Sequence, residues 1–297
     1  MNLADLLHDA VEDVEPVDRL DDLRARTSSP AHAARPWWWA AGGVVVATAA
    51  TVAAFAVVGG GPESTGPAGH DHHGAHAQQT MLVAAYFVGD TPAGPRLFRE
   101  FDEVPSGDAL EAALERIQRP PSDPDYRTSW TATSFGAVEV HDDVIHVELG
   151  DAVLDDDLAV QQVVYTLQAA AGERLPVQLA DASYVAAPQL DVLGLVSISD
   201  PAEGTAYQHD TVMVANGRAS SFEATVPWEL RGEDGEVVRQ GFATADGWQD
   251  RLHPWRARVD LADLLPGFYT FVATTADPAG GAEESLLTTD TRTIIVR

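Results

Sequence analysis

Residues 138–152 read VEVHDDVIHVELGDA and contain the strongest hairpin signal in the chain. Two strand-like runs, 137–141 and 144–149, are separated only by Asp142 and Asp143. A two-residue connection between two such runs is typical of a tight antiparallel hairpin. We therefore predict a β-hairpin here, and the neighbouring elements are assigned outward from it.

The residues around the hairpin predict a small α+β domain over 80–187. Its elements, in chain order, are strands over Met81–Val88 and Arg96–Val104, a helix over Asp108–Ile117, the hairpin, a helix over Leu158–Ala171 and a strand over Pro176–Leu179. Between the first helix and the hairpin, residues 122–130 (SDPDYRTSW) predict a polar loop. This order places helices on one face of one small sheet.

These residues resemble the GerMN domain, which is named from sporulation and spore-germination proteins. The resemblance rests on YFV (86–88), LFREFDEVP (97–105), ALEAALERIQ (109–118), the hairpin and QQVVYTLQ (161–168), and it covers about Leu82 to Asp181. The family's usual Pro or Gly before the first hairpin strand is present only as Gly136. The resemblance implies a non-catalytic domain, similar to ring-building domains that oligomerise in cell-envelope assemblies.

Short strands dominate residues 190–297. The candidates are Leu193–Ile198, Thr211–Val214, Thr225–Leu230, Glu236–Phe242, Arg256–Val259, Phe268–Thr274 and Thr293–Val296. Residues 232–235 (GEDG) have the composition of a hairpin loop. Seven short strands separated by turn signals predict an all-β antiparallel sandwich.

This second half resembles the immunoglobulin-like domain of bacterial spore-germination proteins. The resemblance rests on SISDPAEGTAY (197–207), VMVANGRASSFEATVPWELRGEDGEVVRQG (212–241), LPGFYTFVA (265–273) and TIIV (293–296). A GerMN domain followed by this module is a known pairing, so each resemblance supports the other.

The composition of the chain excludes several functions. Its formal net charge is -28, and all 18 of its basic residues are Arg. Nucleic-acid binding is driven by basic residues that displace counterions, so we expect no nucleic-acid partner. The chain has no Cys, which excludes disulfides, thiolate metal sites and a Cys nucleophile.

A single transmembrane helix is predicted over Trp37–Val58, which is 22 residues without a charge. A helix of that length spans ~33 Å, enough for a hydrocarbon core of ~30 Å. A cleaved signal peptide is the alternative, but 36 residues precede the stretch, and signal peptides have a shorter apolar core near the N-terminus. A buried core helix is a second alternative, and the triple Trp at one end argues against it.

The positions of the arginines orient this helix. Arg24, Arg26 and Arg35 precede it, and no basic residue lies between Val58 and Arg96. The positive-inside rule then places residues 1–36 in the cytoplasm and the folded domains outside, as a single-pass protein of the cell membrane. An amphipathic pattern in the acidic tail predicts a short helix, read either as a marginal tail or as a docking helix.

Residues 59–79 predict a flexible linker rich in His, Gly and Pro. The linker contains the candidate metal ligands His70, Asp71, His72, His73 and His76. Clustered imidazoles suit Zn, Cu or Ni, whereas a low-complexity spacer explains the same residues without a metal. We expect no specific metal site here, because no fold surrounds these residues.

No catalytic motif is present, so we predict no enzyme, cofactor or catalytic residue. The pair His141 and His146 is interpreted as exposed polar residues of the hairpin. Asp155, Asp156 and Asp157 are interpreted as a helix N-terminal cap and not as a Ca²⁺ site. The remaining candidates are tryptophans, with Trp228 assigned to the core and Trp248 and Trp255 assigned to an exposed contact surface.

The sequence therefore predicts a non-enzymatic, membrane-anchored cell-envelope protein. Its partners are expected to be other envelope proteins or further copies of the chain, and the resemblance suggests sporulation or spore germination. A peptidoglycan or surface-glycan binder, with Trp248 and Trp255 as its platform, is the alternative. An envelope hydrolase is the least supported, because no nucleophile and base are visible.

Overall fold

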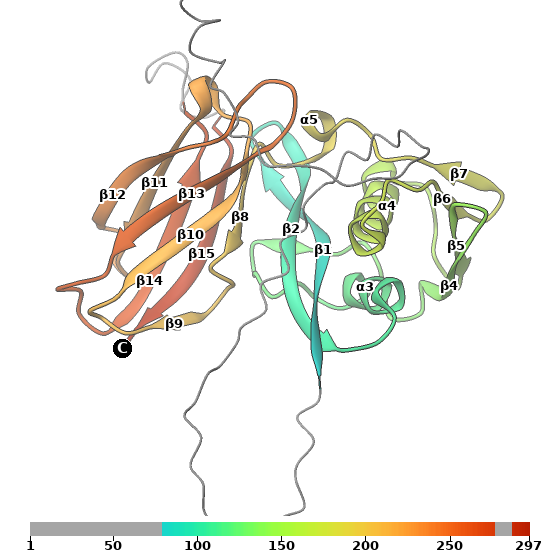
Figure 1. Ribbon diagram of the computed structural model, residues 1–297, viewed down its shortest axis with the longest axis horizontal. Coiled ribbons are helices and arrows are strands. Elements are labelled where there is room, and N and C mark those ends of the chain that lie inside the picture. The colour runs from blue at the N-terminus through green and yellow to red at the C-terminus, as the bar shows by residue number, and fades with distance from the viewer. Residues whose placement is uncertain (1–78, 277–286) are drawn as a thin grey trace, which may run out of the picture. The chain divides into compact units, whose positions relative to one another are not determined.

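The computed structural model describes residues 79–276 and 287–297 (Figure 1). The acidic tail, the helix predicted over Trp37–Val58 and nearly all of the predicted linker lie outside the described residues. Within the described ranges, no helix combines the length and the apolar character needed to cross a membrane.

The chain first forms a long antiparallel ribbon. Strands β1 (Thr80–Thr91) and β2 (Gly94–Pro105) pair along their whole length, so that Thr91 lies opposite Gly94. A short strand, β3 (Tyr126–Arg127), pairs with the other side of β1. The prediction of an uninterrupted loop over 122–130 is therefore wrong, because a two-residue strand is too short to show a period in sequence.

Both predicted helices are confirmed, and each begins at an aspartate. Helix α3 (Ala109–Ile117) is capped by the Asp108 side chain, which accepts from the N–H of Leu110 at 2.8 Å. Helix α4 (Asp157–Ala171) is capped by Asp156, which accepts from Leu158 at 2.9 Å. Helix α4 ends at Gly172, whose φ of 70° is left-handed and suits glycine.

The predicted hairpin is also confirmed, but it belongs to a second sheet. Strands β4 (Phe135–His141) and β5 (Val144–Leu149) are joined by Asp142 and Asp143, whose φ values of 50° and 60° give the twist that two-residue hairpins need. Strand β6 (Val177–Leu179) pairs with β5 in parallel, and β7 (Ala182–Tyr184) pairs with β6.

The prediction of one small sheet is therefore wrong. The strand orders are β2-β1-β3 and β4-β5-β6-β7, and both helices pack between the two sheets (Figure 1). Since β5 and β6 run parallel, the chain needs a crossover between them, and α4 supplies it. The largest side chains of the shared core include Phe87, Leu114, Ile117, Ile145, Leu167 and Leu179.

The C-terminal part is a two-sheet sandwich, as predicted (Figure 1). One sheet has the order β13 (His253–Asp260), β10 (Val212–Ala219) and β8 (Val196–Asp200). The other has the order β12 (Val237–Thr244), β11 (Thr225–Arg231), β14 (Gly267–Thr274), β15 (Thr289–Val296) and β9 (Thr205–Tyr207). Strand β9 escapes sequence prediction because it has three residues and pairs in parallel with β15.

The two parts contact each other, and all of the described residues belong to one compact unit. A short helix, α5 (Gln189–Val192), connects them, and Leu193 forms a bridge to Leu97 of β2. The Phe98 ring packs against this connection so closely that a Cβ on Gly194 would lie 2.4 Å from its Cε1 atom. A small apolar cluster seals the contact, formed by Val88, Leu97, Tyr165, Leu193 and Leu252.

Candidate functional site

The most unusual chemistry of the described residues lies where the two parts meet. Asp123, from the segment after α3, and Tyr126, from β3, contact Asp290 and Arg292 of β15. We name these four residues the junction centre. Asp123, Asp290 and Arg292 are only 1%, 3% and 3% exposed, so the charges have little contact with solvent.

Arg292 is the hub of the junction centre. Its Nη1 atom donates to Asp123, to Asp290 Oδ1 at 3.0 Å and to the Tyr126 hydroxyl at 3.1 Å. Tyr126 in turn donates its hydroxyl proton to Asp290 Oδ1 at 2.5 Å. Each charged group therefore has a hydrogen-bonded partner, which is the condition for keeping charges inside a protein.

The junction centre lies beside β8, at the edge of the three-stranded sheet of the sandwich. Strand β8 is an edge strand, and the backbone groups on its free side need partners. The Ile198 N–H donates to Asp290 Oδ2 at 2.5 Å, and the Ile198 carbonyl accepts from Arg292 Nη2 at 3.0 Å. Side chains of β15 thus satisfy the free edge of β8 across the opening of the sandwich.

The centre holds two carboxyl groups but one guanidinium. Burial raises the pKa of Asp123 to about 7, although Arg292 opposes the shift. Burial likewise raises the pKa of Asp290 against the effect of Arg292. Burial and the neighbouring Asp290 charge raise the pKa of Tyr126, so the phenol stays protonated. When one of the two carboxyl groups is protonated, a single carboxylate faces the single guanidinium and the centre is electrically neutral.

A second ionic group holds the loop in place. Glu100 of β2 accepts from the N–H groups of Ser122 and Asp123, at 3.0 and 2.8 Å. Arg116 of α3 pairs with Glu100 at 2.9 Å and with Asp102 at 2.6 Å. Hydrogen bonds to β2 therefore fix the position of Asp123 opposite β15. This fixed position favours a structural role for the junction centre.

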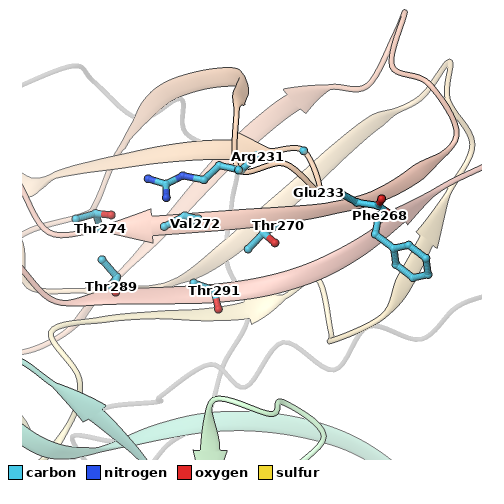
Figure 2. A pocket seen from close by; sticks show the side chains of 10 residues that line it. Arg231, Glu233, Phe268, Thr270, Val272, Thr274, Thr289 and Thr291 are labelled. Carbon is cyan, nitrogen blue, oxygen red and sulfur yellow. The ribbon is translucent and has the colours of Figure 1, made fainter.

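A hollow lies elsewhere, on the outer face of the five-stranded sheet (Figure 2). Its volume is ≈ 500 Å³, and Figure 2 shows Thr270, Thr274, Thr289 and Thr291 along its floor. Its charged side chains are Arg231 and Glu233, and Arg231 pairs with Glu229 at 2.6 Å. This lining suits contact with the surface of another molecule. It contains no nucleophile placed beside a general base, so it does not have the arrangement of a catalytic site.

The hairpin histidines and the aspartates before α4 are found where the sequence analysis placed them, whereas His70, Asp71, His72, His73 and His76 lie outside the described residues. His141 and His146 are on the exposed hairpin with ring centroids 6.0 Å apart, and His141 Nε2 lies 2.7 Å from Glu139. Asp156 caps α4 and so confirms the helix-cap interpretation. Residues 79–276 and 287–297 contain no group of three or more His, Asp or Glu arranged for a metal ion.

The tryptophan prediction needs one correction. Trp228 is buried as expected, but Trp255 is only 3% exposed and cannot form a contact surface. Strand β13 begins at His253, three residues before the predicted start, and its alternation turns Trp255 inward with Ala257 and Val259. Trp248 is 36% exposed and packs edge-on against Phe222, with ring centroids 5.2 Å apart.

The junction centre itself was missed by the sequence analysis. Its one local signal is the alternation of residues 289–296, where Asp290 and Arg292 share the inward face with Ile294 and Val296. Two opposite charges at inward positions of a strand indicate a buried ion pair. Asp123 and Tyr126 carry no such signal, because their partners are more than 160 residues away in the chain.

Family models match both parts. Residues 84–180 match Germane, described as "Sporulation and spore germination", and residues 195–282 match Gmad2, described as "Immunoglobulin-like domain of bacterial spore germination". The chain is a germination-type protein with a C-terminal immunoglobulin-like domain. The junction centre joins its Germane domain to β15, the last strand of its immunoglobulin-like domain. Asp290 and Arg292 lie just beyond the second matched range.

Other comparisons add little. No curated protein matches the chain. One solved structure, an engineered protein crystallised at 1.98 Å resolution, is 21% identical, with 50% of this chain and 30% of that chain covered and a TM-score of 0.28. The match spans less than a third of that structure, and so low a TM-score supports no conclusion.

Proposed function

We propose that the chain is a non-enzymatic, membrane-anchored protein of the cell envelope. In this proposal its Germane and immunoglobulin-like domains act outside the membrane as one module that assembles with other envelope proteins or with further copies of itself. The matched families relate to sporulation and spore germination, which supports a role in that process. The anchor is the helix predicted over Trp37–Val58, from sequence alone.

The observation that carries the proposal is the outer face of the five-stranded sheet. We define this face by Pro227, Phe242, Phe268, Val272 and the threonines of β14 and β15. Phe242 and Phe268 are 73% and 53% exposed, and Phe242 lies directly opposite Pro227. Figure 2 shows the Phe268 ring turned away from the strands. Exposed apolar side chains on the same face as a shallow hollow are typical of protein–protein contact surfaces.

Free strand edges support the same function. Strand β4 ends its sheet, and its residues from Gly136 to His141 are exposed except for the half-buried Val138. Such an edge offers unpaired N–H and C=O groups to a strand of a partner. The junction centre supports the proposal further, because it fixes two surfaces from different domains relative to one another.

Chemical crosslinking in intact cells, followed by mass spectrometry, tests the proposal. We expect crosslinks from the outer sheet face or from β4 to one envelope protein or to a second copy of the chain. Crosslinks that never exceed those of an unrelated membrane-anchored control would overturn it. A parallel cell-wall pull-down with Trp248→Ala tests the glycan alternative. Since Trp255 is buried, Trp248 is the remaining candidate from that pair, and the alternative predicts that the variant is retained less by the cell wall.

A further inference from the structure

Two arginines from different domains line one small crevice at the junction, apart from the junction centre. Arg99 belongs to β2 and Arg218 belongs to β10. The crevice is lined by Tyr86, Leu97, Arg99, Leu193, Gly194, Ser197, Arg218 and Leu252. Its walls thus come from both domains and from the connection between them.

The two guanidiniums make few hydrogen bonds. Arg99 Nη2 donates to Ser199 Oγ at 3.0 Å, and Arg218 donates from Nε and Nη2 to the Leu252 carbonyl, each at 3.3 Å. A guanidinium has five N–H donors, so both side chains keep donors that these contacts do not use.

Neither arginine is paired with an acid among the described residues. The ion pairs formed there involve other arginines and histidines. Burial and the positive charges of Arg99 and Arg251 lower the pKa of Arg218. The acid nearest to Arg251 is Asp250, at 4.0 Å, and Asp250 is already bound by His253. Positive charges gathered in this way are unfavourable until an anion offsets them.

The size of the crevice limits what can enter it. Its volume of ≈ 10 Å³ is that of about one water-sized probe. A space of this size has room for no more than one oxygen atom of an oxyanion, so the rest of such a group would have to lie outside it. Guanidinium groups bind the paired oxygens of carboxylates and phosphates with matching geometry.

We propose that the crevice between Arg99 and Arg218 binds one oxyanion group, a carboxylate or a phosphate, carried by a ligand. The net charge of -28 repels polyanions at long range. Contact with two guanidiniums acts within the Debye length of ~8 Å, so a single oxyanion group still binds. The site is independent of the proposed assembly function, and its occupation ties β2 of one domain to β10 of the other.

The test is an NMR titration of the purified full-length chain that follows the Nε–Hε signals of arginine. Inorganic phosphate and acetate are added separately at constant ionic strength, with sodium chloride as the balance. We expect saturable shifts at Arg99 and Arg218, and the tighter of the two probes identifies the ligand group. Arg99→Gln or Arg218→Gln should weaken the apparent affinity at least about tenfold.

Arg258→Gln is the matched control, because Arg258 is an exposed arginine of β13. This variant should keep the affinity of the unchanged chain. Shifts that rise linearly without saturation for both probes would overturn the proposal, as would equal affinities in all three variants. The titration of the unchanged chain decides the question even where a variant fails to fold.

Discussion

Tyr126 donates its hydroxyl proton to Asp290 across 2.5 Å, although 164 positions separate the two residues in the chain. Tyr126 belongs to the Germane domain and Asp290 to the last strand of the immunoglobulin-like domain. Arg292 contacts both, so the domains share one buried ionic group. The stability of the pair of domains should therefore depend on this group.

Removal of the Arg292 guanidinium should be strongly destabilising. Arg292→Gln leaves Asp123 and Asp290 buried without their cation, and breaking a buried ion pair from one side costs about 3–5 kcal/mol. Urea unfolding of the purified chain measures the loss. The exposed Arg258→Gln control should change the unfolding free energy by about 0.5 kcal/mol or less. Equal effects of the two substitutions would contradict the structure of the centre.

Asp123 should make stability depend on pH. Its pKa is about 7 in the folded chain, against an ordinary value of 3.8, so between these pH values the folded state holds a proton that the unfolded state has lost. The contribution of Asp123 to the unfolding free energy is therefore fully present below pH 3.8. Between pH 3.8 and about 7 it falls by about 1.4 kcal/mol per pH unit, and above that range it is constant.

The matched variant for that slope is Asp123→Asn, which cannot titrate. We expect urea unfolding at pH 5, 6, 7 and 8 to show a wild-type stability that falls relative to the variant up to pH 7. The comparison uses the difference in slope, so a constant cost of the Asn side chain does not affect it. Parallel curves for the two proteins would show that Asp123 has an ordinary pKa.

Gly194 should tolerate no side chain. A Cβ at this position would lie 2.4 Å from the Phe98 ring, and overpacking of this kind costs about 1–3 kcal/mol. Gly194→Ala should lower the thermal midpoint, whereas Gly107→Ala should not, since the nearest atom to a Cβ at Gly107 is 4.0 Å away. Similar thermal midpoints for the two variants would contradict the close packing of the Phe98 ring against Gly194.

The two tryptophans that the sequence grouped together should behave differently. Trp255→Ala empties a core position and should cost about 3–5 kcal/mol in urea unfolding. Trp248→Ala changes a partly exposed residue and should cost far less, with the loss of its contact to Phe222 as the main effect. A larger loss for Trp248→Ala would reverse the assignment of core and surface.

Local signals predicted much of the fold. Asp142 and Asp143, Asp108 and Gly172 each act within a few residues, so the hairpin, the start of α3 and the end of α4 are visible in sequence. The division of the first part into two sheets is not visible, because the parallel pairing of β5 with β6 spans a whole helix.

The junction centre depends on contacts that are more distant still. Asp123 looks like an ordinary loop aspartate until β15 brings Arg292 to it. Trp255 was misplaced for a simpler reason, since the predicted strand began too late by three residues. Sequence patterns therefore identified the local elements, while the interface between the domains required the fold.

Photocrosslinking in living cells tests the proposed assembly most directly. A photoreactive amino acid is placed at Phe242 on the outer sheet face, with the exposed Arg256 of the opposite sheet as the control position. We predict a discrete adduct with another protein or with a second copy of the chain at Phe242, and little or none at Arg256. Equal labelling from both positions, or no protein adduct from Phe242, would contradict the proposal that this face binds a partner.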